Sequence, residues 1–230
     1  MTSSNIWEDI HFHKSWGKYP NEEVIRFVGK NFFRLPTEER KKIKILDLGL
    51  GQGSNSLSLI KEGFDVYGID IAPSGISKFK KRLEEENVIV EDFDDKFKVG
   101  DIREIPFLNS VFDVVIDCAT TWYVSHTEHK LVYKEINRVL VDDGLFFSWH
   151  ILKNSWGYSE DSLIDKNTLK MVEEGPLANQ GISYFADYDD LIELLNNNDF
   201  KIEEKEKLTK SYENMTKTLK YAIIHAKKIR

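Results

Sequence analysis

Three glycines at alternating positions follow a short apolar run and form the part of this sequence best suited to binding chemistry. Gly49, Gly51 and Gly53 come directly after the run 43–48, and Asp47 stands two residues before the first of them. Glycines in that position let the backbone turn sharply and approach a ligand at the N-terminus of a following helix. The segment therefore predicts a nucleotide-like ligand at a strand-to-helix turn.

The spacing of these glycines separates the loop from two common nucleotide-binding loops. The dinucleotide fingerprint requires Gly-x-Gly-x-x-Gly, and Ser54 stands where its third glycine would be. A phosphate-binding loop is excluded because no Gly-Lys-Ser/Thr follows. The carboxylate of Asp47 would be a poor neighbour for a pyrophosphate and a good one for a cationic amino-acid group. The loop therefore favours a ligand with an amino-acid portion.

Two further aspartates stand at the ends of the next two predicted strands. Asp70, 23 residues after Asp47, is placed to accept hydrogen bonds from both hydroxyls of a ribose, and Ile71 follows it in the predicted site. Asp101 could accept the exocyclic amine of a purine, with Ile102 against the ring. Each aspartate alone is equally well explained as a helix cap. All three at successive strand ends predict one nucleoside site, because ligands of open α/β sheets bind there.

The elements that would position these residues alternate between strand and helix. Predicted strands are 43–48, 65–70, 96–100, 111–117 and 144–149, and predicted helices are 22–33, 74–86 and 128–140. This alternation predicts a mostly parallel sheet with helices on both faces. A further helix at 188–197 and two strand-like runs at 201–208 and 218–226 predict an antiparallel pair at the sheet edge. His129 is expected on the outer face of its helix.

These motifs resemble those of class I S-adenosylmethionine-dependent methyltransferases. Segments 112–117 and 135–144 extend the likeness, which covers about residues 43–150 and is greatest to small-molecule methyltransferases of the ubiquinone-biosynthesis type. The tail, 182–226, fits the last helix and strand pair of that fold. One departure is Val141-Asp-Asp-Gly144, where the family usually has Pro-Gly-Gly before the fifth strand. The resemblance implies an α/β, Rossmann-like methyltransferase fold with a seven-stranded sheet and S-adenosylmethionine as the cofactor.

The resemblance also implies a role for each residue of the predicted cofactor site. Asp47 and the three glycines would hold the methionine end, Asp70 the ribose, and Asp101 with Ile102 the adenine. Asp117 and Cys118 would lie beside the methionine portion. Trp16 and Tyr19 are predicted to close over the cofactor, although Trp16 could equally be a structural hydrophobic staple. No metal is required for transfer from a sulfonium, and no cluster of metal ligands is apparent.

The residues expected to face the methyl acceptor follow the fourth and fifth predicted strands. His126 and His150 are the predicted general bases, with Tyr123 as a third catalytic residue, and Trp122 and Tyr184 are predicted to contact the substrate. Ordinary packing, for the aromatics, and capping or structural roles, for the histidines, remain equal alternatives. The segment after the fourth strand lacks the Pro-Pro motif of methyltransferases that modify nucleobase amines, which disfavours that reaction.

One domain of 230 residues is predicted, divided into an N-terminal helical lid (1–36), a cofactor-binding core (37–151), a cap insertion (152–187) and a C-terminal helix with a strand pair (188–230). The cap is assigned to the binding site because it is rich in aromatic residues and follows the sheet. A merely structural insertion is its alternative.

The composition of the chain limits the kinds of partner and cellular location that we expect. A net charge of −7 weighs against nucleic acid, no apolar run is long enough to cross a bilayer, and a single cysteine excludes a disulfide framework. We therefore expect a cytoplasmic enzyme with a small-molecule acceptor, no membrane insertion and possible homodimers. Segment 16–27 resembles a bacterial subgroup linked in part to surface-polysaccharide or sugar tailoring, which favours a sugar- or phosphate-bearing acceptor. Methylation of RNA or protein, and a non-catalytic cofactor-binding protein, are the alternatives.

Overall fold

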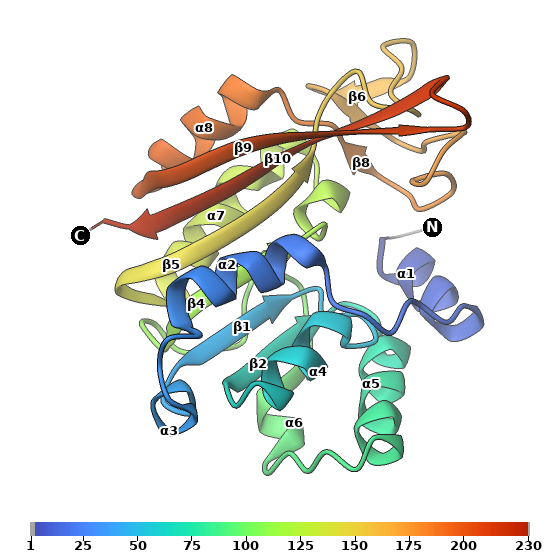
Figure 1. Cartoon of the computed structure of the whole chain (residues 1–230). Coiled ribbons are helices and arrows are strands. Elements are labelled where there is room, and N and C mark those ends of the chain that lie inside the picture. The colour runs from blue at the N-terminus through green and yellow to red at the C-terminus, as the bar shows by residue number, and fades with distance from the viewer. Residues whose placement is uncertain (1–2, 230) are drawn as a thin grey trace.

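A seven-stranded sheet organises the chain, and the computed structural model describes residues 3–229 of it. The strands are β1 (Lys44–Leu48), β2 (Asp65–Asp70), β3 (Phe97–Val99), β4 (Phe112–Cys118), β5 (Leu140–Ile151), β9 (Phe200–Tyr212) and β10 (Lys217–Lys228). Their order across the sheet is β3-β2-β1-β4-β5-β10-β9 (Figure 1). β1 to β5 run parallel, whereas β10 is antiparallel to β5 and β9. The predicted fold class is confirmed.

Helices cover both faces of the sheet. They are α1 (Ser3–His13), α2 (Glu22–Phe32), α3 (Thr37–Arg40), α4 (Ser54–Lys61), α5 (Pro73–Glu85), α6 (Phe93–Lys96), the 3-10 turn η1 (Thr121–Tyr123), α7 (His126–Val139) and α8 (Tyr188–Asn196). On one face α2, α4 and α5 bury residues such as Phe27, Leu57 and Phe79 against the strands. On the other, α7 and α8 bury Ile136 and Leu191. Apolar side chains at helical spacing thus form two core layers, one on each side of the sheet.

Local sequence signals set the starts of two helices that frame the sheet. The side chain of Asn21 accepts a hydrogen bond from the backbone N–H of Glu23 and so caps the N-terminus of α2. Ser125 and Glu128 form a reciprocal capping box at the start of α7. The capping box fixes the turn that leads out of β4, and this turn borders the cavity described below.

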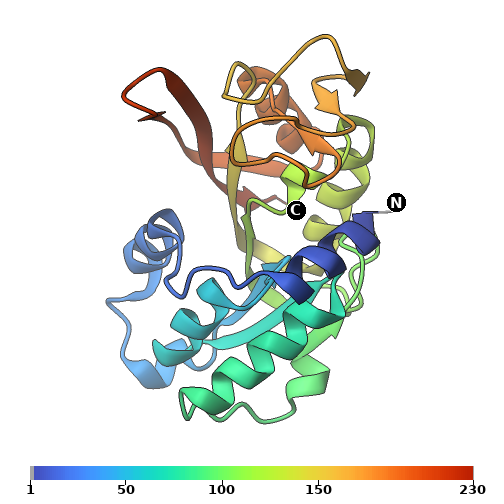
Figure 2. The ribbon, with the colours of Figure 1, turned by 90° about the vertical axis from the view of Figure 1, so that its right-hand side faces the viewer.

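The predicted cap, 152–187, contains a small antiparallel sheet of β6 (Leu163–Asp165), β7 (Thr168–Leu169) and β8 (Ser183–Tyr184). Together with the end of β10 it encloses a third apolar core, which includes Trp122 and Phe185. The cap stands above the carboxyl ends of the strands, facing α1 and α5 across the molecule (Figure 2). It is therefore a folded unit with its own core.

The lid predicted over 1–36 divides into two parts with different positions. α1 lies along α5 at the carboxyl ends of the strands (Figure 2). By contrast, α2 packs against the sheet, where Val24, Phe27 and Val28 are buried. Only α1 and the chain that follows it therefore cover the strand ends, because the apolar face of α2 is taken up by the core.

The expected position of His129 on an outer helix face is wrong. Its side chain is fully buried, and its Nε2 lies 3.3 Å from Nε2 of His150 on β5. The ring of Tyr184, from the cap, packs against it at 4.5 Å between centroids. His129 precedes the buried Val132 and Tyr133 by three and four positions, so it lies on the same core-facing side of α7 as they do.

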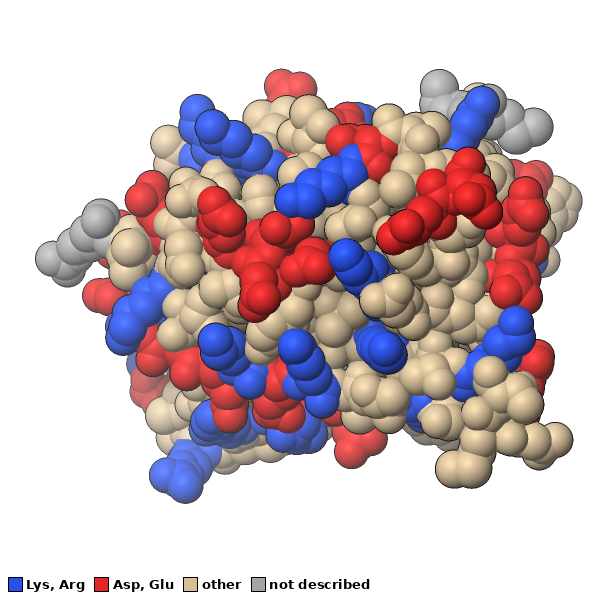
Figure 3. All heavy atoms as spheres, turned by 90° about the horizontal axis from the view of Figure 1, so that it is seen from above, with Lys and Arg blue, Asp and Glu red and all other residues tan. Residues whose placement is uncertain are grey.

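The surface carries charges of both signs. Seen from above the view of Figure 1, acidic and basic side chains are interspersed, with a group of acidic ones near the centre (Figure 3). Many of the exposed charges are paired, as in the ion pairs Lys30–Glu204 and Arg26–Glu206 between α2 and β9. Within residues 3–229 no helix has the length and apolar character needed to span a membrane.

Candidate active site

A cavity of about 340 Å³ lies at the carboxyl ends of β1 to β4, beneath α1. Nine residues of the predicted site line it: Trp16, Gly49, Gly51, Asp70, Ile71, Asp101, Ile102, Cys118 and Tyr123. They converge because β1 lies between β2 and β4, with Leu48 paired to Ile69 on one side and Asp117 on the other. Loops leaving neighbouring parallel strands meet at one edge of the sheet, as the sequence predicted.

The glycine loop is held in a conformation that requires its glycines. Gly49, Gly51 and Gly53 have φ values of +60°, +55° and +74°, in the left-handed region that other residues rarely adopt. A Cβ on Gly49 would lie 2.3 Å from Oγ1 of Thr120, whose hydroxyl donates to the Leu48 carbonyl at 2.5 Å. Backbone atoms of the first two glycines therefore form the cavity wall. Gly53 packs against Phe79 and does not line the cavity.

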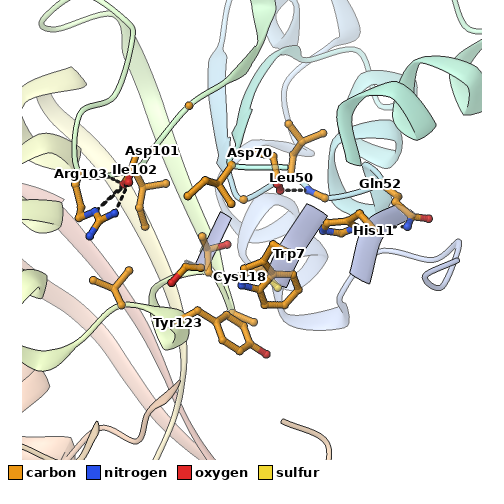
Figure 4. Close-up of a pocket in the computed structure, with 18 of the residues that line it drawn as sticks. Trp7, His11, Leu50, Gln52, Asp70, Asp101, Ile102, Arg103, Cys118 and Tyr123 are labelled. Carbon is orange, nitrogen blue, oxygen red and sulfur yellow. Dashed lines mark hydrogen bonds and ion pairs between the residues drawn. The ribbon is translucent and has the colours of Figure 1, made fainter. Parts of the chain in front are cut away.

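The carboxylate of Asp70 can accept more hydrogen bonds than the two that the protein donates to it. Oδ2 accepts from the backbone N–H of Gly51 at 2.7 Å and Oδ1 from that of Ala72 at 2.8 Å (Figure 4). A carboxylate has about four lone-pair positions, so each oxygen retains one for a ligand. Burial raises the pKa of Asp70, against the opposing effect of these hydrogen bonds and of His11. The group therefore pays a desolvation cost that a pair of hydroxyl donors would offset.

Asp101 is held by Arg103 and lies at the other end of the cavity (Figure 4). Nε of Arg103 lies 2.9 Å from Oδ1 and 3.0 Å from Oδ2, and a second nitrogen of the guanidinium also bonds Oδ2. Arg103 extends on to Glu128 of the α7 capping box. Burial opposes ionisation of Asp101, but the hydrogen bonds and charge of Arg103 outweigh it and lower its pKa. Asp101 is therefore an oriented, ionised acceptor.

Asp47 and Asp117 lie beneath the cavity and do not line it. Ser56 donates to Oδ2 of Asp47 at 2.6 Å, and burial raises the pKa of Asp47 to about 7. Oδ1 of Asp117 accepts the backbone N–H groups of Thr120 and Thr121 at 3.1 Å, and its pKa is also raised by burial. Neither carboxylate faces the cavity; their hydrogen bonds brace the loops after β1 and β4.

Aromatic side chains from separate parts of the chain roof the cavity. Trp7 of α1 meets Tyr123 of η1 edge-on, with 4.5 Å between centroids, above Cys118 (Figure 4). The ring of His11 lies 5.7 Å from Trp7 and 5.9 Å from Trp16. Sequence reasoning missed Trp7 and His11 because no helix was predicted over 3–13. Their spacing of four residues, which puts both on one helix face, was the available signal.

Polar contacts fix α1 and the following segment over the strand ends. Oε2 of Glu8 accepts from the backbone N–H of Ser74 at 3.0 Å, at the start of α5. Gln52 in the glycine loop accepts from the backbone N–H of Trp16 at 3.1 Å and donates to the Lys14 carbonyl at 2.8 Å. The roof is thus bound to the same loop that forms the floor of the cavity.

Several predicted residues lie away from the cavity. His150 is buried in its pair with His129, and burial lowers the pKa of His150 to about 3 and of His129 to about 4. Trp122 donates from Nε1 to the Trp149 carbonyl at 2.6 Å and belongs to the third core. The others outside the lining are His126 and Tyr184, whose rings pack together, and Tyr19, which is 89% exposed. The acceptor-side predictions were thus mostly misplaced.

Comparison with known proteins identifies the core of the chain. Residues 46–148 match the family described as "Methyltransferase domain". This part of the chain is a methyltransferase domain. YqeM of Bacillus subtilis (strain 168), provisionally named a methyltransferase, is 31% identical over 113 residues, 48% of this chain and 43% of that protein. The family and the cofactor predicted from the sequence are confirmed.

Solved structures extend the similarity over most of the chain. An S-adenosylmethionine-dependent methyltransferase of Methanosarcina mazei superposes with a TM-score of 0.66 at 23% identity, covering 82% of this chain and 93% of that one. The 1,6-didemethyltoxoflavin N1-methyltransferase of Burkholderia thailandensis, solved with its substrate and S-adenosylhomocysteine, gives 0.62 at 14%, covering 91% and 78%. At these identities the likeness establishes the fold. The chain spans about half the length of the curated relatives it matches.

The lining of the cavity fits S-adenosylmethionine by its chemistry. Ile71 and Ile102 offer apolar surfaces for a purine, and Asp101 stands beside them as an acceptor. Asp70 retains two free lone pairs for a diol. The glycine loop leaves room for the amino-acid portion, with Asn55 and Cys118 on the same side. Along the cavity, the apolar surfaces for the purine, the carboxylate for the ribose and the glycine backbone for the amino-acid portion thus follow one another in the order of these parts in the cofactor.

Proposed function

We propose that the protein transfers a methyl group from S-adenosylmethionine to a small metabolite. The observation that carries this proposal is the cavity itself. In it the strand ends, which carry the hydrogen-bond-accepting carboxylates, face an aromatic roof formed by Trp7, Trp16 and Tyr123. The cavity is bounded by α1 and the cap, and Ile182 of the cap completes its wall. A cavity bounded on these sides suits a compact acceptor.

The cofactor supplies an electrophilic methyl carbon bonded to a sulfonium sulfur. Asp70 would bind the ribose, and Asp101 would accept a hydrogen bond from the exocyclic amine of the adenine. The glycine loop and Asn55 would hold the amino-acid end. Trp7 and Tyr123 exclude water and present their rings to the cationic centre, an attraction worth up to about 2 kcal/mol when desolvated. These side chains thereby hold donor and acceptor in line, which is the main requirement of a displacement at carbon.

Among the described roof residues, Trp7 and Trp16 offer no proton acceptor, and Nδ1 of His11 is engaged by the amide of Gln52. His126 and His150, proposed from the sequence as bases, lie outside the cavity lining. Tyr123 donates its hydroxyl to Oε1 of Gln180 at 2.6 Å, and burial raises its pKa, as burial also raises that of the Cys118 thiol. We therefore favour an acceptor that needs no strong base, such as an amine or ring nitrogen. The N1-methyltransferase from Burkholderia thailandensis, by its name, acts on such a nitrogen.

The charges of the residues that line the cavity limit which methyl acceptors it can bind. Among the described lining residues, Asp70, Asp101 and Glu128 are acidic, whereas Arg103 is the single Lys or Arg and is already paired to two of them. Two unit charges 4 Å apart interact by about 1 to 4 kcal/mol at effective dielectric constants of 80 to 20. A sugar-bearing acceptor remains within the proposal, whereas a phosphate-bearing one would meet uncompensated negative charge.

A macromolecular acceptor, RNA or protein, is the second candidate. Charges of both signs are mixed over the face in Figure 3, and the net charge is −7, which together offer little attraction to nucleic acid. A non-catalytic cofactor-binding protein would leave the aromatic roof without a chemical purpose. Both considerations favour the small metabolite.

The test is turnover with fractionated acceptors. Purified protein with S-adenosylmethionine and a bacterial metabolite extract should form S-adenosylhomocysteine, measured by mass spectrometry. Nuclease or protease treatment of the extract should leave the activity unchanged. Loss of activity after either treatment would assign the acceptor to RNA or protein. Cofactor binding without turnover of any fraction would indicate the non-catalytic alternative.

A further inference from the structure

We propose that His11 is a cofactor-positioning residue: its Nε2–H donates to a hydroxyl of the ribose that Asp70 binds. This inference rests on the proposed function, since it takes S-adenosylmethionine or its product as the ligand. It assigns to α1 a direct role in recognising the nucleoside, beyond covering the cavity. No role for His11 follows from the motifs of the core, because the residue lies outside residues 46–148.

The position of His11 places its ring against the glycine loop. The side chain comes from the cavity-facing side of α1, is 5% exposed and lines the cavity together with Gly51 and Asp70. A Cβ on Gly51 would lie 3.2 Å from Cε1 and 3.6 Å from Nε2 of His11. The imidazole therefore approaches closely only because residue 51 is glycine. The backbone N–H of the same glycine donates to Asp70, so His11 and the ribose-binding carboxylate share one neighbour.

Hydrogen bonds around Gln52 determine which nitrogen of His11 carries the proton. Oε1 of Gln52 accepts from the backbone N–H of Trp16, and Nε2 of Gln52 donates to the Lys14 carbonyl, so the orientation of the amide is fixed. The same Nε2 lies 3.4 Å from Nδ1 of His11 and can only donate to it. Nδ1 is therefore the acceptor, and neutral His11 carries its hydrogen on Nε2.

The protonation state of His11 supports a neutral donor. Burial lowers its pKa, while the charge of Asp70 works in the opposite direction. Lys78 of α5 adds to the lowering, and Glu8 of α1 opposes it. A second proton would also have to sit on Nδ1, facing the N–H of Gln52. The ring is thus held as one donor and one occupied acceptor at neutral pH.

Donor and acceptor are complementary but do not bond each other. No hydrogen bond or ion pair joins His11 to Asp70 among the contacts of residues 3–229, although both face the same cavity (Figure 4). Asp70 needs hydroxyl donors for its two remaining lone pairs, and His11 offers an N–H that a hydroxyl oxygen can accept. A vicinal diol satisfies both groups at once. The arrangement therefore favours a ribose over a deoxyribose.

The experiment is a comparison of binding affinities by calorimetry. The ligands are S-adenosylhomocysteine and its 2′-deoxy and 3′-deoxy analogues, and the proteins are wild type, His11→Phe and His11→Gln. Phe keeps a ring beside Trp7 and Trp16 but has no donor, whereas Gln restores an N–H near the position of Nε2. Loss of one hydrogen bond should weaken binding of S-adenosylhomocysteine by about 2- to 12-fold in His11→Phe. His11→Gln should recover part of the loss.

A matched control is available on the same helix. His13 is one of two histidines in the last turn of α1, its side chain is 66% exposed, and it faces Asp9 at 3.5 Å. His13→Phe should bind S-adenosylhomocysteine as the wild type does. Thermal unfolding of each variant verifies that it is folded.

The inference predicts that the effect of His11→Phe vanishes for one of the two deoxy analogues, because the partner hydroxyl is then absent. An equal loss for all three ligands would give His11 a merely structural role and overturn the inference. An unchanged affinity of His11→Phe, or an equal loss in His13→Phe, would overturn it as well. Wild-type protein that binds no S-adenosylhomocysteine would refute the proposed function itself, which distinguishes the two failures.

Discussion

Replacing Asp70 by asparagine should change two quantities independently: the affinity for S-adenosylhomocysteine and the pH dependence of stability. The side chain keeps its shape, but one carboxylate oxygen becomes an NH₂ group. Because both oxygens accept a backbone N–H, this group faces the N–H of either Gly51 or Ala72, and the ribose hydroxyl on that side loses its charged acceptor. Hydrogen bonds to charged groups contribute about 1.5–3 kcal/mol. We therefore expect the Kd for S-adenosylhomocysteine to rise about 10- to 150-fold.

The unliganded protein should respond differently. Because burial raises the pKa of Asp70, the native state holds its proton to higher pH than the unfolded chain does. Stability therefore falls as pH rises from the unfolded pKa, about 3.9, to the raised native value. Asparagine carries no charge and removes this pH-dependent loss, so the melting temperature of Asp70→Asn relative to that of the wild type should rise between about pH 4 and pH 8, whatever the lost backbone hydrogen bond costs at both pH values.

Both quantities can be measured on one sample. Trp7 and Trp16 line the cavity, so quenching of tryptophan fluorescence reports S-adenosylhomocysteine binding, and a thermal melt reports stability. Asp65→Asn at the opposite end of β2, where Asp65 pairs with Lys96, is the matched control and should leave affinity unchanged. An Asp70→Asn protein that binds within about twofold of wild type would refute the assignment, since that corresponds to less than one hydrogen bond.

Three further predictions concern residues around the cavity. His126→Gln should leave kcat within about twofold at every pH, whereas loss of a general base would cost about 100-fold or more; a pH–rate profile decides between them. Tyr123→Phe breaks the 2.6 Å bond to Gln180 and should lower the melting temperature by about 2–4 °C, for a cost of about 1 kcal/mol; an unchanged melt would show that this bond does not stabilise the cap. Asp47, whose pKa is raised to about 7, should make stability fall between about pH 4 and pH 7, and thermal melts of Asp47→Asn across that range should show a smaller decline than those of the wild type.

Much of the fold could be read from local sequence because β1 to β4 are short, mostly apolar runs with a glycine, aspartate or threonine at or within two residues of their ends. Asp70 and Asp101 mark strand ends, and the three glycines mark the turn after β1. Strand order and the position of these residues then follow from the rules of parallel sheets. This is why most of the predicted cofactor residues line one cavity.

The parts that were missed depend on contacts between distant segments. α1 is held in place by Ser74 and Gln52, neither of which lies near it in the sequence, so its position over the cavity could not be inferred from residues 3–13 alone. His129 shares the buried face of α7 with Val132 and Tyr133, and this spacing was a signal that the sequence offered. By contrast, His126 and His150 lie outside the cavity lining where Tyr184 of the cap packs against both rings, a contact that local sequence does not encode.

The central claim is that the cavity at the strand ends binds S-adenosylmethionine and its product. Calorimetry of the folded wild-type protein with S-adenosylhomocysteine, and separately with NADH, tests it most directly. We predict one-to-one binding of S-adenosylhomocysteine and no measurable binding of NADH, as the glycine spacing requires. Binding of NADH, or an absence of heat with S-adenosylhomocysteine, would contradict the account.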